Sequence, residues 1–176
     1  MTKQYSQKIM MLSLWQPWAS LCVWKNPDDG KAEKQIETRH WSTEYRGLIA
    51  IHATKTLNAN SRWAIQNNTY IQEALTHHKA VDFGSVKRVT LTVGSIIGVV
   101  ELIDVREMEL TNSWASDRDL QFGIYMPGRF GWIFNNPVEF KNPIECRGLQ
   151  NLGSPKPEIE VRIFEELARS QTNAKS

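Results

Sequence analysis

Apolar residues along the chain recur in short runs that predict several β-strands. Residues 10–15, 47–53 and 95–105 are apolar with β-branched or aromatic side chains among them, a composition typical of strands. The segment 95–105, SIIGVVELIDV, is apolar nearly throughout and is interrupted by Glu101. It therefore predicts a central strand that is covered on both faces.

Further strands are predicted toward the C-terminus. Residues 130–134 and 138–140 form two short apolar runs with Asn-Asn-Pro between them, which predicts two strands joined by a turn. Residues 144–147 predict another short strand. Residues 76–93 show only weak periodicity, so they predict a loop or an insertion.

Three segments carry helix signals. Pro17 suits the first turn of a helix, because its fixed φ is helical and it has no N–H to leave unpaired. The apolar stripe of this helix consists of Trp18, Leu21 and Cys22. Asn58 or Asn60 can cap a second helix that runs to about residue 75. Pro157 starts a third, whose apolar face consists of Ile159, Ile163, Phe164 and Leu167.

Several short strands with few, separated helices favour an α+β fold built around a small, mostly antiparallel β-barrel. A chain of 176 residues suggests a single domain. We expect the barrel domain to extend over residues 9–150. The polar residues 1–8 are expected to form a frayed tail, and residues 151–176 a C-terminal helix and tail.

Composition allows a real core but does not identify a partner. Apolar residues make up 41% of the chain, and the net charge of +2 with a pI near 8.5 does not by itself indicate nucleic acid. Cys22 and Cys146 lie among apolar or strand-forming residues, so we expect buried thiols and no disulfide. No apolar run approaches the length of a membrane span, and the N-terminus lacks a secretory leader. We therefore expect a soluble, cytoplasmic protein without membrane contact.

The stretch KQIETRHW, residues 34–41, carries the strongest functional signal. From Glu37 onward the spacing is even, so an extended chain would point Glu37, Arg39 and Trp41 to the same side. A carboxylate, a guanidinium and an indole on one face are more typical of a ligand site than of a core. Apolar, strand-forming segments flank the stretch on both sides, which predicts that it is held rigidly.

The chain resembles the ASCH domain, named for activating signal cointegrator homology and a member of the PUA-like superfamily. In chain order, the segments that carry the resemblance are SLWQPWASL, KQIETRHW, YRGLIAIHA, GVVELIDV and GRFGWIFNNP, and together they extend over about residues 11–148. The resemblance implies a PUA-like β-barrel of five or six strands with a cleft on one side. It also implies ligands such as RNA, DNA or nucleotides. Some members of the family act as small amidohydrolases on acetylated cytidine or as ribonucleases.

The family signature G-x-K-x-x-E-x-R fits this chain at three of its four fixed positions. Lys34, Glu37 and Arg39 occupy the last three, but Ala32 stands where the signature has glycine. The nearest glycine is Gly30, so the loop NPDDGKAE is interpreted as an insertion. The departure concerns the path of the backbone before Lys34.

Two interpretations of the signature residues stay open at this stage. Lys34 can be a nucleophile or base if burial depresses its pKa, or a solvated loop lysine that contacts phosphate or pairs with Glu37. Glu37 and Arg39 can bind a ligand, since a guanidinium suits a phosphate or a base edge, or form an internal salt bridge that shapes the loop. The resemblance favours a site role for both.

Other candidates surround the signature. Trp15 and Trp41 either offer faces on which a base can stack or pack into the protein core. Trp18 is expected to pack into the core. His52 lies on the opposite strand face from its apolar neighbours and is expected to face the cleft. Glu101 either pairs with Lys34 or Arg39 or marks the point where its strand meets solvent. The predicted ligand-binding set is Lys34, Glu37, Arg39, Trp41, Trp15, Gln16, His52, Lys55 and Arg129.

Two classes of function remain. The first is a binding module for RNA, single-stranded nucleic acid, a nucleotide or a modified nucleoside. The second is a small amidohydrolase acting on acetylated cytidine or related nucleobase amides, or a ribonuclease, with Lys34, Glu37 and Glu101 as catalytic residues. His77 and His78 have no partners at metal-ligand spacing, and no phosphate-binding or dinucleotide-binding glycine motif is present. We therefore expect no metal and no cofactor; protein partners are not predicted.

Overall fold

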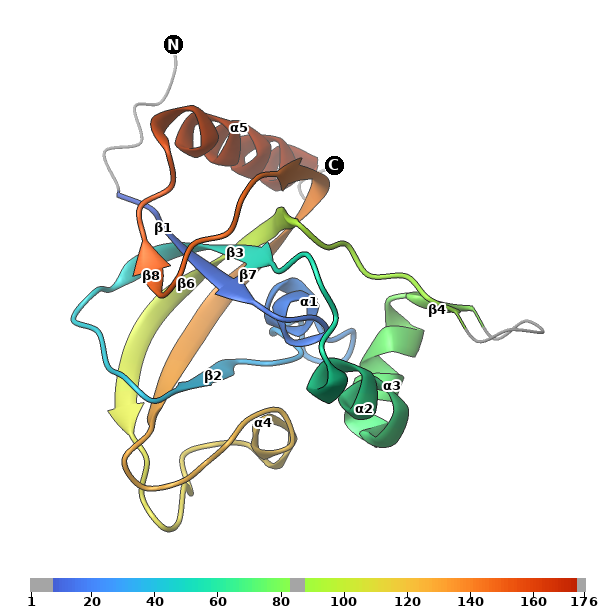
Figure 1. Cartoon of the computed structure of the whole chain (residues 1–176), viewed down its shortest axis with the longest axis vertical. Coiled ribbons are helices and arrows are strands. Elements are labelled where there is room, and N and C mark those ends of the chain that lie inside the picture. Colours follow the sequence, from blue (N-terminus) through green and yellow to red (C-terminus); the bar gives the residue numbers. More distant parts are fainter. Residues whose placement is uncertain (1–7, 83–87, 174–176) are drawn as a thin grey trace.

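A computed structural model of the chain describes residues 8–82 and 88–173. Its main element is a mixed sheet of six strands in the order β2-β7-β6-β3-β1-β8, which curls into a half-barrel (Figure 1). The strands are β1 (Met10–Leu14), β2 (Ile36–Arg39), β3 (Gly47–Ala53), β6 (Ser95–Glu107), β7 (Phe130–Glu145) and β8 (Leu152–Gly153).

All neighbouring strands in this sheet are antiparallel except β1 and β3, which are parallel. The described residues also form the helices α1 (Trp18–Val23), α2 (Ala59–Asn67), α3 (Thr69–His77), α4 (Asp117–Leu120) and α5 (Pro157–Asn173). The predicted α+β class, with a small and mostly antiparallel sheet of six strands, is therefore confirmed.

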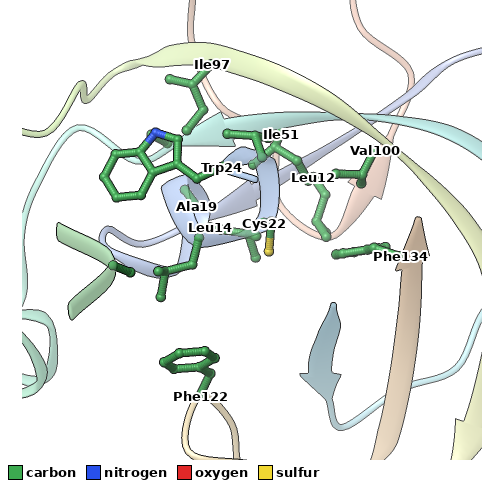
Figure 2. Close-up of a cluster of buried hydrophobic side chains, with 14 of the residues drawn as sticks. Leu12, Leu14, Ala19, Cys22, Trp24, Ile51, Ile97, Val100, Phe122 and Phe134 are labelled. Carbon is green, nitrogen blue, oxygen red and sulfur yellow. The ribbon is translucent and has the colours of Figure 1, made fainter. Parts of the chain in front are cut away.

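The strands bury side chains on both faces because apolar residues fill both sets of alternating positions. Leu12 and Leu14 of β1 join a core cluster with α1, whereas Met11 joins a second cluster with α5. Figure 2 shows the first cluster, in which Cys22 of α1 lies among residues of several strands. The second cluster includes Ile163 of α5, so the C-terminal helix adds to the core of the sheet.

A glycine in β6 lets α1 approach the sheet closely. A Cβ atom built on Gly98 would lie 2.3 Å from the carbonyl oxygen of Val138 and 2.9 Å from Val23 Cγ1. Because real Cβ atoms do not come this close to backbone, only glycine fits between β7 and α1 at this point. The register of β6 shifts against both of its neighbours near this residue.

Three element predictions are corrected. The helix predicted from residue 58 to 75 is two helices, because Asn58 caps α2 and the Asn68 side chain accepts from the Ile71 N–H to cap α3. The two strands predicted around Asn-Asn-Pro are one long strand, β7. Asn136 takes a positive φ of 48° there, and the irregular register against β6 absorbs the distortion.

The segment predicted as a loop contains the paired strands β4 (Val81–Asp82) and β5 (Arg88–Val89). The thiols of Cys22 and Cys146 are free, as predicted, with Cys22 buried and Cys146 half-buried. Of the predicted frayed tail 1–8, residues 1–7 lie outside the described residues. In the described part of the chain, none of the helices combines the length and apolar character needed to cross a membrane.

Candidate functional site

A cleft of about 1040 Å³ lies where the C-terminal end of β1, the edge strand β2, the helices α2 and α3 and the loop after α4 come together. Figure 1 shows α2 and α3 next to one another, with α4 near the β2 edge of the sheet. The lining comprises Ser13, Leu14, Trp15, Trp18, Glu37, Thr38, Arg39, Thr54, Asn60, Trp63, Ala64, Asn68, Ile71, Gln121, Phe122, Gly123, Ile124, Arg129, Leu149, Gln150 and Asn151.

The strand β2 brings two of the signature residues to the cleft. Along its IETR sequence, Ile36 and Thr38 are buried and Glu37 and Arg39 are half-buried, as the period of two predicts. Its main chain is held on one side by β7 and at its start by Asp119, whose Oδ1 accepts from the N–H groups of Gln35 (2.8 Å) and Ile36 (3.2 Å). The two charged side chains therefore project from a fixed backbone.

Lys34, Glu37 and Arg39 form a chain of ion pairs. Lys34 Nζ lies 2.9 Å from Glu37 Oε2, and Arg39 Nε lies 3.3 Å from Glu37 Oε1. Arg39 Nη2 also donates to the Ser13 carbonyl at 3.3 Å. Both carboxylate oxygens of Glu37 are thus engaged by cations, and the guanidinium is held against β1.

Lys34 is the innermost member of this chain of ion pairs. The residue is fully buried, and its Nζ donates to the Ile36 carbonyl as well as pairing with Glu37. Lys34 is absent from the cleft lining, whereas its partner Glu37 belongs to it. A buried amine that pairs with a carboxylate can stabilise that carboxylate, but in this arrangement it cannot touch a ligand. The geometry therefore does not support Lys34 as an attacking nucleophile.

The wall formed by α3 is joined to the wall after α4 by a second buried carboxylate, that of Glu33. Its side chain pairs with Arg118, which also reaches Glu73 Oε2 at 3.2 Å, and with His78 Nε2 at 3.3 Å. Burial opposes the ionisation of Glu33, but His78, Arg118 and Asn26 together hold its pKa below the usual value. These ion pairs thus hold α3 and α4 together outside the cleft lining.

Arg129 lies next to β2 in the lining. Its Nε donates to the Ile124 carbonyl at 3.2 Å and its Nη2 to the Thr38 carbonyl at 3.1 Å. The guanidinium therefore connects β2 to the loop after α4 and supplies a second positive charge. Glu37, Arg39 and Arg129 are the charged residues of the described lining.

Several predicted site residues lie outside the lining. Trp41 follows the end of β2 and packs edge-on against the buried Trp132, with ring centroids 4.6 Å apart. Gln16 is fully buried and donates to Ser20 and to the Thr92 carbonyl, and Lys55 is exposed away from the cleft.

His52 and Glu101 also differ from expectation. His52 is buried behind the lining, with Nε2 at 3.1 Å from the Cys146 carbonyl and Nδ1 at 3.4 Å from Ser13 Oγ. Burial lowers its pKa. Glu101 does not pair with Lys34 or Arg39; instead it accepts from the Asn136 side chain at 2.7 Å, away from the cleft.

The cleft contains residues that sequence reasoning missed. Trp63 of α2 has an exposed fraction of 65%, and Trp15, which was predicted, has one of 51%. The missed side-chain amides are those of Asn60, Asn68, Gln121, Gln150 and Asn151. A tryptophan at a polar position of a helix was the one signal that could have identified Trp63, since the buried residues of α2 are Ser61 and Ala64.

These groups define what the site can do chemically. Exposed indoles can stack on flat rings, guanidinium groups can bind phosphate or base edges, and amides can both donate and accept hydrogen bonds. The thiol nearest to the ion-pair chain is inert, because burial raises the pKa of Cys22 to about 12. Within the described residues no group of three or more histidine, cysteine or acidic side chains has the arrangement of a metal site.

Solved structures share the fold of this chain. The crystal structure of ASCH from Zymomonas mobilis matches with a TM-score of 0.51 and 15% sequence identity, covering 90% of this chain and 94% of its own. A point mutant of the same bacterial protein matches with a TM-score of 0.51 and 14% identity, covering 90% and 98%. No family model and no curated protein matches the sequence. The structural likeness establishes that this chain has the fold of an ASCH domain.

Proposed function

We propose that this protein binds single-stranded RNA or a nucleotide in the cleft between β2, α2 and the loop after α4. The observation that carries the proposal is the combination of two guanidinium groups, Arg39 and Arg129, with the exposed indoles of Trp15 and Trp63 in one open lining. Proteins that bind single strands combine these elements: cations contact phosphates, and aromatic side chains stack on bases.

The position of Lys34 supports binding over catalysis by this residue. An enzyme that used the amine would need it in contact with the substrate, whereas Lys34 is buried outside the cleft lining. The cleft is also large, with a volume of about 1040 Å³. These features favour a binding surface with a positively charged inner wall.

Titration of a short single-stranded RNA tests the proposal. Arg39→Gln should weaken binding and reduce the salt dependence by about one phosphate contact, a change of about 0.7 in the slope of log K against log salt. Arg162→Gln is the matched control, because it removes the same charge from the exposed face of α5, outside the cleft. Thermal melts of both variants verify that the fold is intact. Equal salt slopes for the wild type and Arg39→Gln would exclude Arg39 from the binding site.

A hydrolytic function is the second candidate, and the placement of Glu37 favours it. Its carboxylate lines the cleft and is fixed by two cations, so it is positioned to hold or activate a water beside a bound nucleobase amide. Acetylated cytidine and single-stranded RNA are the substrates to assay, with Glu37→Gln as the variant. Turnover by the wild type that is lost in Glu37→Gln would support this candidate, and no turnover by the wild type would remove it.

A further inference from the structure

The helix α2 presents a second aromatic surface to the cleft. Asn60, Trp63 and Ala64 lie at i, i+3 and i+4, so they share one face of the helix, and all line the cleft. Ala64 is buried, whereas Trp63 keeps 65% of its surface exposed at the rim. An indole this exposed contributes little to the core, and its apolar face is available to a flat partner.

The remaining polar groups of the lining suit base edges more than phosphates. Asn60, Gln121, Gln150 and Asn151 are exposed amides, and none of their side-chain amide groups has a hydrogen-bond partner among the described residues. Neutral amides donate and accept at the same time, as the edges of nucleobases do. The positive charge, in contrast, is confined to Arg39 and Arg129, which lie on β2 and just before β7.

The cleft is large for a single base. Pockets for one drug-sized ligand typically measure about 300–1,000 Å³, and this cleft, at about 1040 Å³, lies at the upper end of that range. Trp15 projects from the end of β1 and Trp63 from α2, so the two exposed indoles belong to different walls. Room for more than one base is thus combined with two separate stacking surfaces.

We infer that the cleft binds two bases of one single strand, the first stacked on Trp15 and the second on Trp63, with the guanidinium groups at the phosphates. This inference rests on the proposed function and assigns the preferred ligand class: an oligonucleotide of at least two residues, bound more tightly than a lone nucleoside or nucleotide. The amides beside Trp63 then contact the edge of the second base, with Asn60 one helical turn from the indole.

Calorimetric titration with unlabelled ligands tests the inference. The ligands are a uridine mononucleotide, a diuridine dinucleotide and a tetranucleotide. The proteins are the wild type, Trp63→Leu, Trp63→Phe and the control Val161→Ala, which alters an exposed apolar residue of α5. Leucine keeps the apolar character at the rim but removes the ring, whereas phenylalanine keeps a stacking face.

The wild type should bind the dinucleotide about 5- to 150-fold more tightly than the mononucleotide, the gain expected from one stacked base. Trp63→Leu should lose this gain, so that it binds the mono- and the dinucleotide with similar affinity, while Trp63→Phe should retain most of it. Equal affinity of the wild type for mono- and dinucleotide, or equal losses for both ligands in Trp63→Leu, would overturn the inference while leaving the binding function in place. No binding of any of the ligands to the wild type would overturn the proposed function itself.

Discussion

Replacement of Lys34 by methionine tests whether this lysine has a structural role. Methionine has a similar length and is apolar, so Lys34→Met fills the same buried space without opening a cavity. It removes the pair with Glu37 and the hydrogen bond to the Ile36 carbonyl. Any loss of stability therefore reports on these two polar contacts.

The expected cost follows from the burial of the pair. Removing one partner of a buried ion pair typically costs about 3–5 kcal/mol, because the other charge is left uncompensated. Glu37 keeps a side-chain exposure of 12% and its contact with Arg39, so the cost should lie at the lower end, about 3 kcal/mol. For a chain of this size that corresponds to a fall in Tm of roughly 6–12 °C.

Thermal and urea unfolding of four variants measure this effect: Lys34→Met, Glu37→Gln, their combination and Lys55→Met. Lys55→Met is the matched control: the lysine is exposed and outside the ion-pair chain, so its replacement should change the free energy of unfolding by less than about 0.5 kcal/mol. Glu37→Gln combined with Lys34→Met should cost less than the sum of the single changes, because each removes the same pair. A Lys34→Met protein as stable as the wild type, or additive single costs, would refute the structural role.

Three further predictions concern residues around the sheet. Burial lowers the pKa of His52, so as the pH falls the unfolded chain binds a proton at this histidine before the folded protein does. The wild type should therefore lose stability below about pH 6.5, by up to about 1.4 kcal/mol per pH unit. In urea titrations at several pH values, His52→Gln should reduce this dependence of stability on pH. The Tyr125 hydroxyl is buried without a hydrogen-bond partner among the described residues, so Tyr125→Phe should leave the Tm unchanged or raise it, and a fall of several degrees would contradict this. Gly98→Ala should destabilise the folded protein by about 2 kcal/mol or more, since the added Cβ would collide with the Val138 carbonyl. A Tm equal to that of the wild type would contradict this and show that the strands move apart to accommodate the methyl group.

Continuous apolar runs predicted the strands β3 and β6 because both faces of these strands are buried over most of their length. The predicted ranges 47–53 and 95–105 correspond to β3 and most of β6. The sequence pattern gave the wrong elements at two asparagines. Asn68 ends one helix and caps the next, and Asn136 bends a strand that continues instead of forming a turn. Asparagine tolerates a positive φ and also caps helices, so the same residue type is compatible with a turn, a cap or a bulge. The surrounding tertiary contacts decide among these outcomes.

The sequence predicted part of the lining, namely Glu37 and Arg39 of β2 together with Trp15 and Arg129. Alternation correctly places Glu37 and Arg39 on one side, but the strand ends at Arg39, and Trp41 turns away to pack on Trp132. Trp63 comes from an element distant in the sequence, and no local pattern relates it to β2. The burial of Lys34 is likewise non-local, because it depends on how the segment before β2 docks against α1 and Asp119.

The ion-pair chain gives the signature a physical explanation that does not require a reacting lysine. Alone on an edge strand, Arg39 would sample many rotamers, and fixing it at the moment of binding would cost affinity. Lys34 fixes one oxygen of Glu37, and the other oxygen of Glu37 then pairs with the guanidinium, whose Nη2 is also held by Ser13. The orientation of the Arg39 guanidinium in the cleft is thus supported by an amine that lies outside the cleft lining. The spacing K-x-x-E-x-R follows from this arrangement: Glu37 and Arg39 must share a strand face, and the lysine must lie before the strand, where it can be buried.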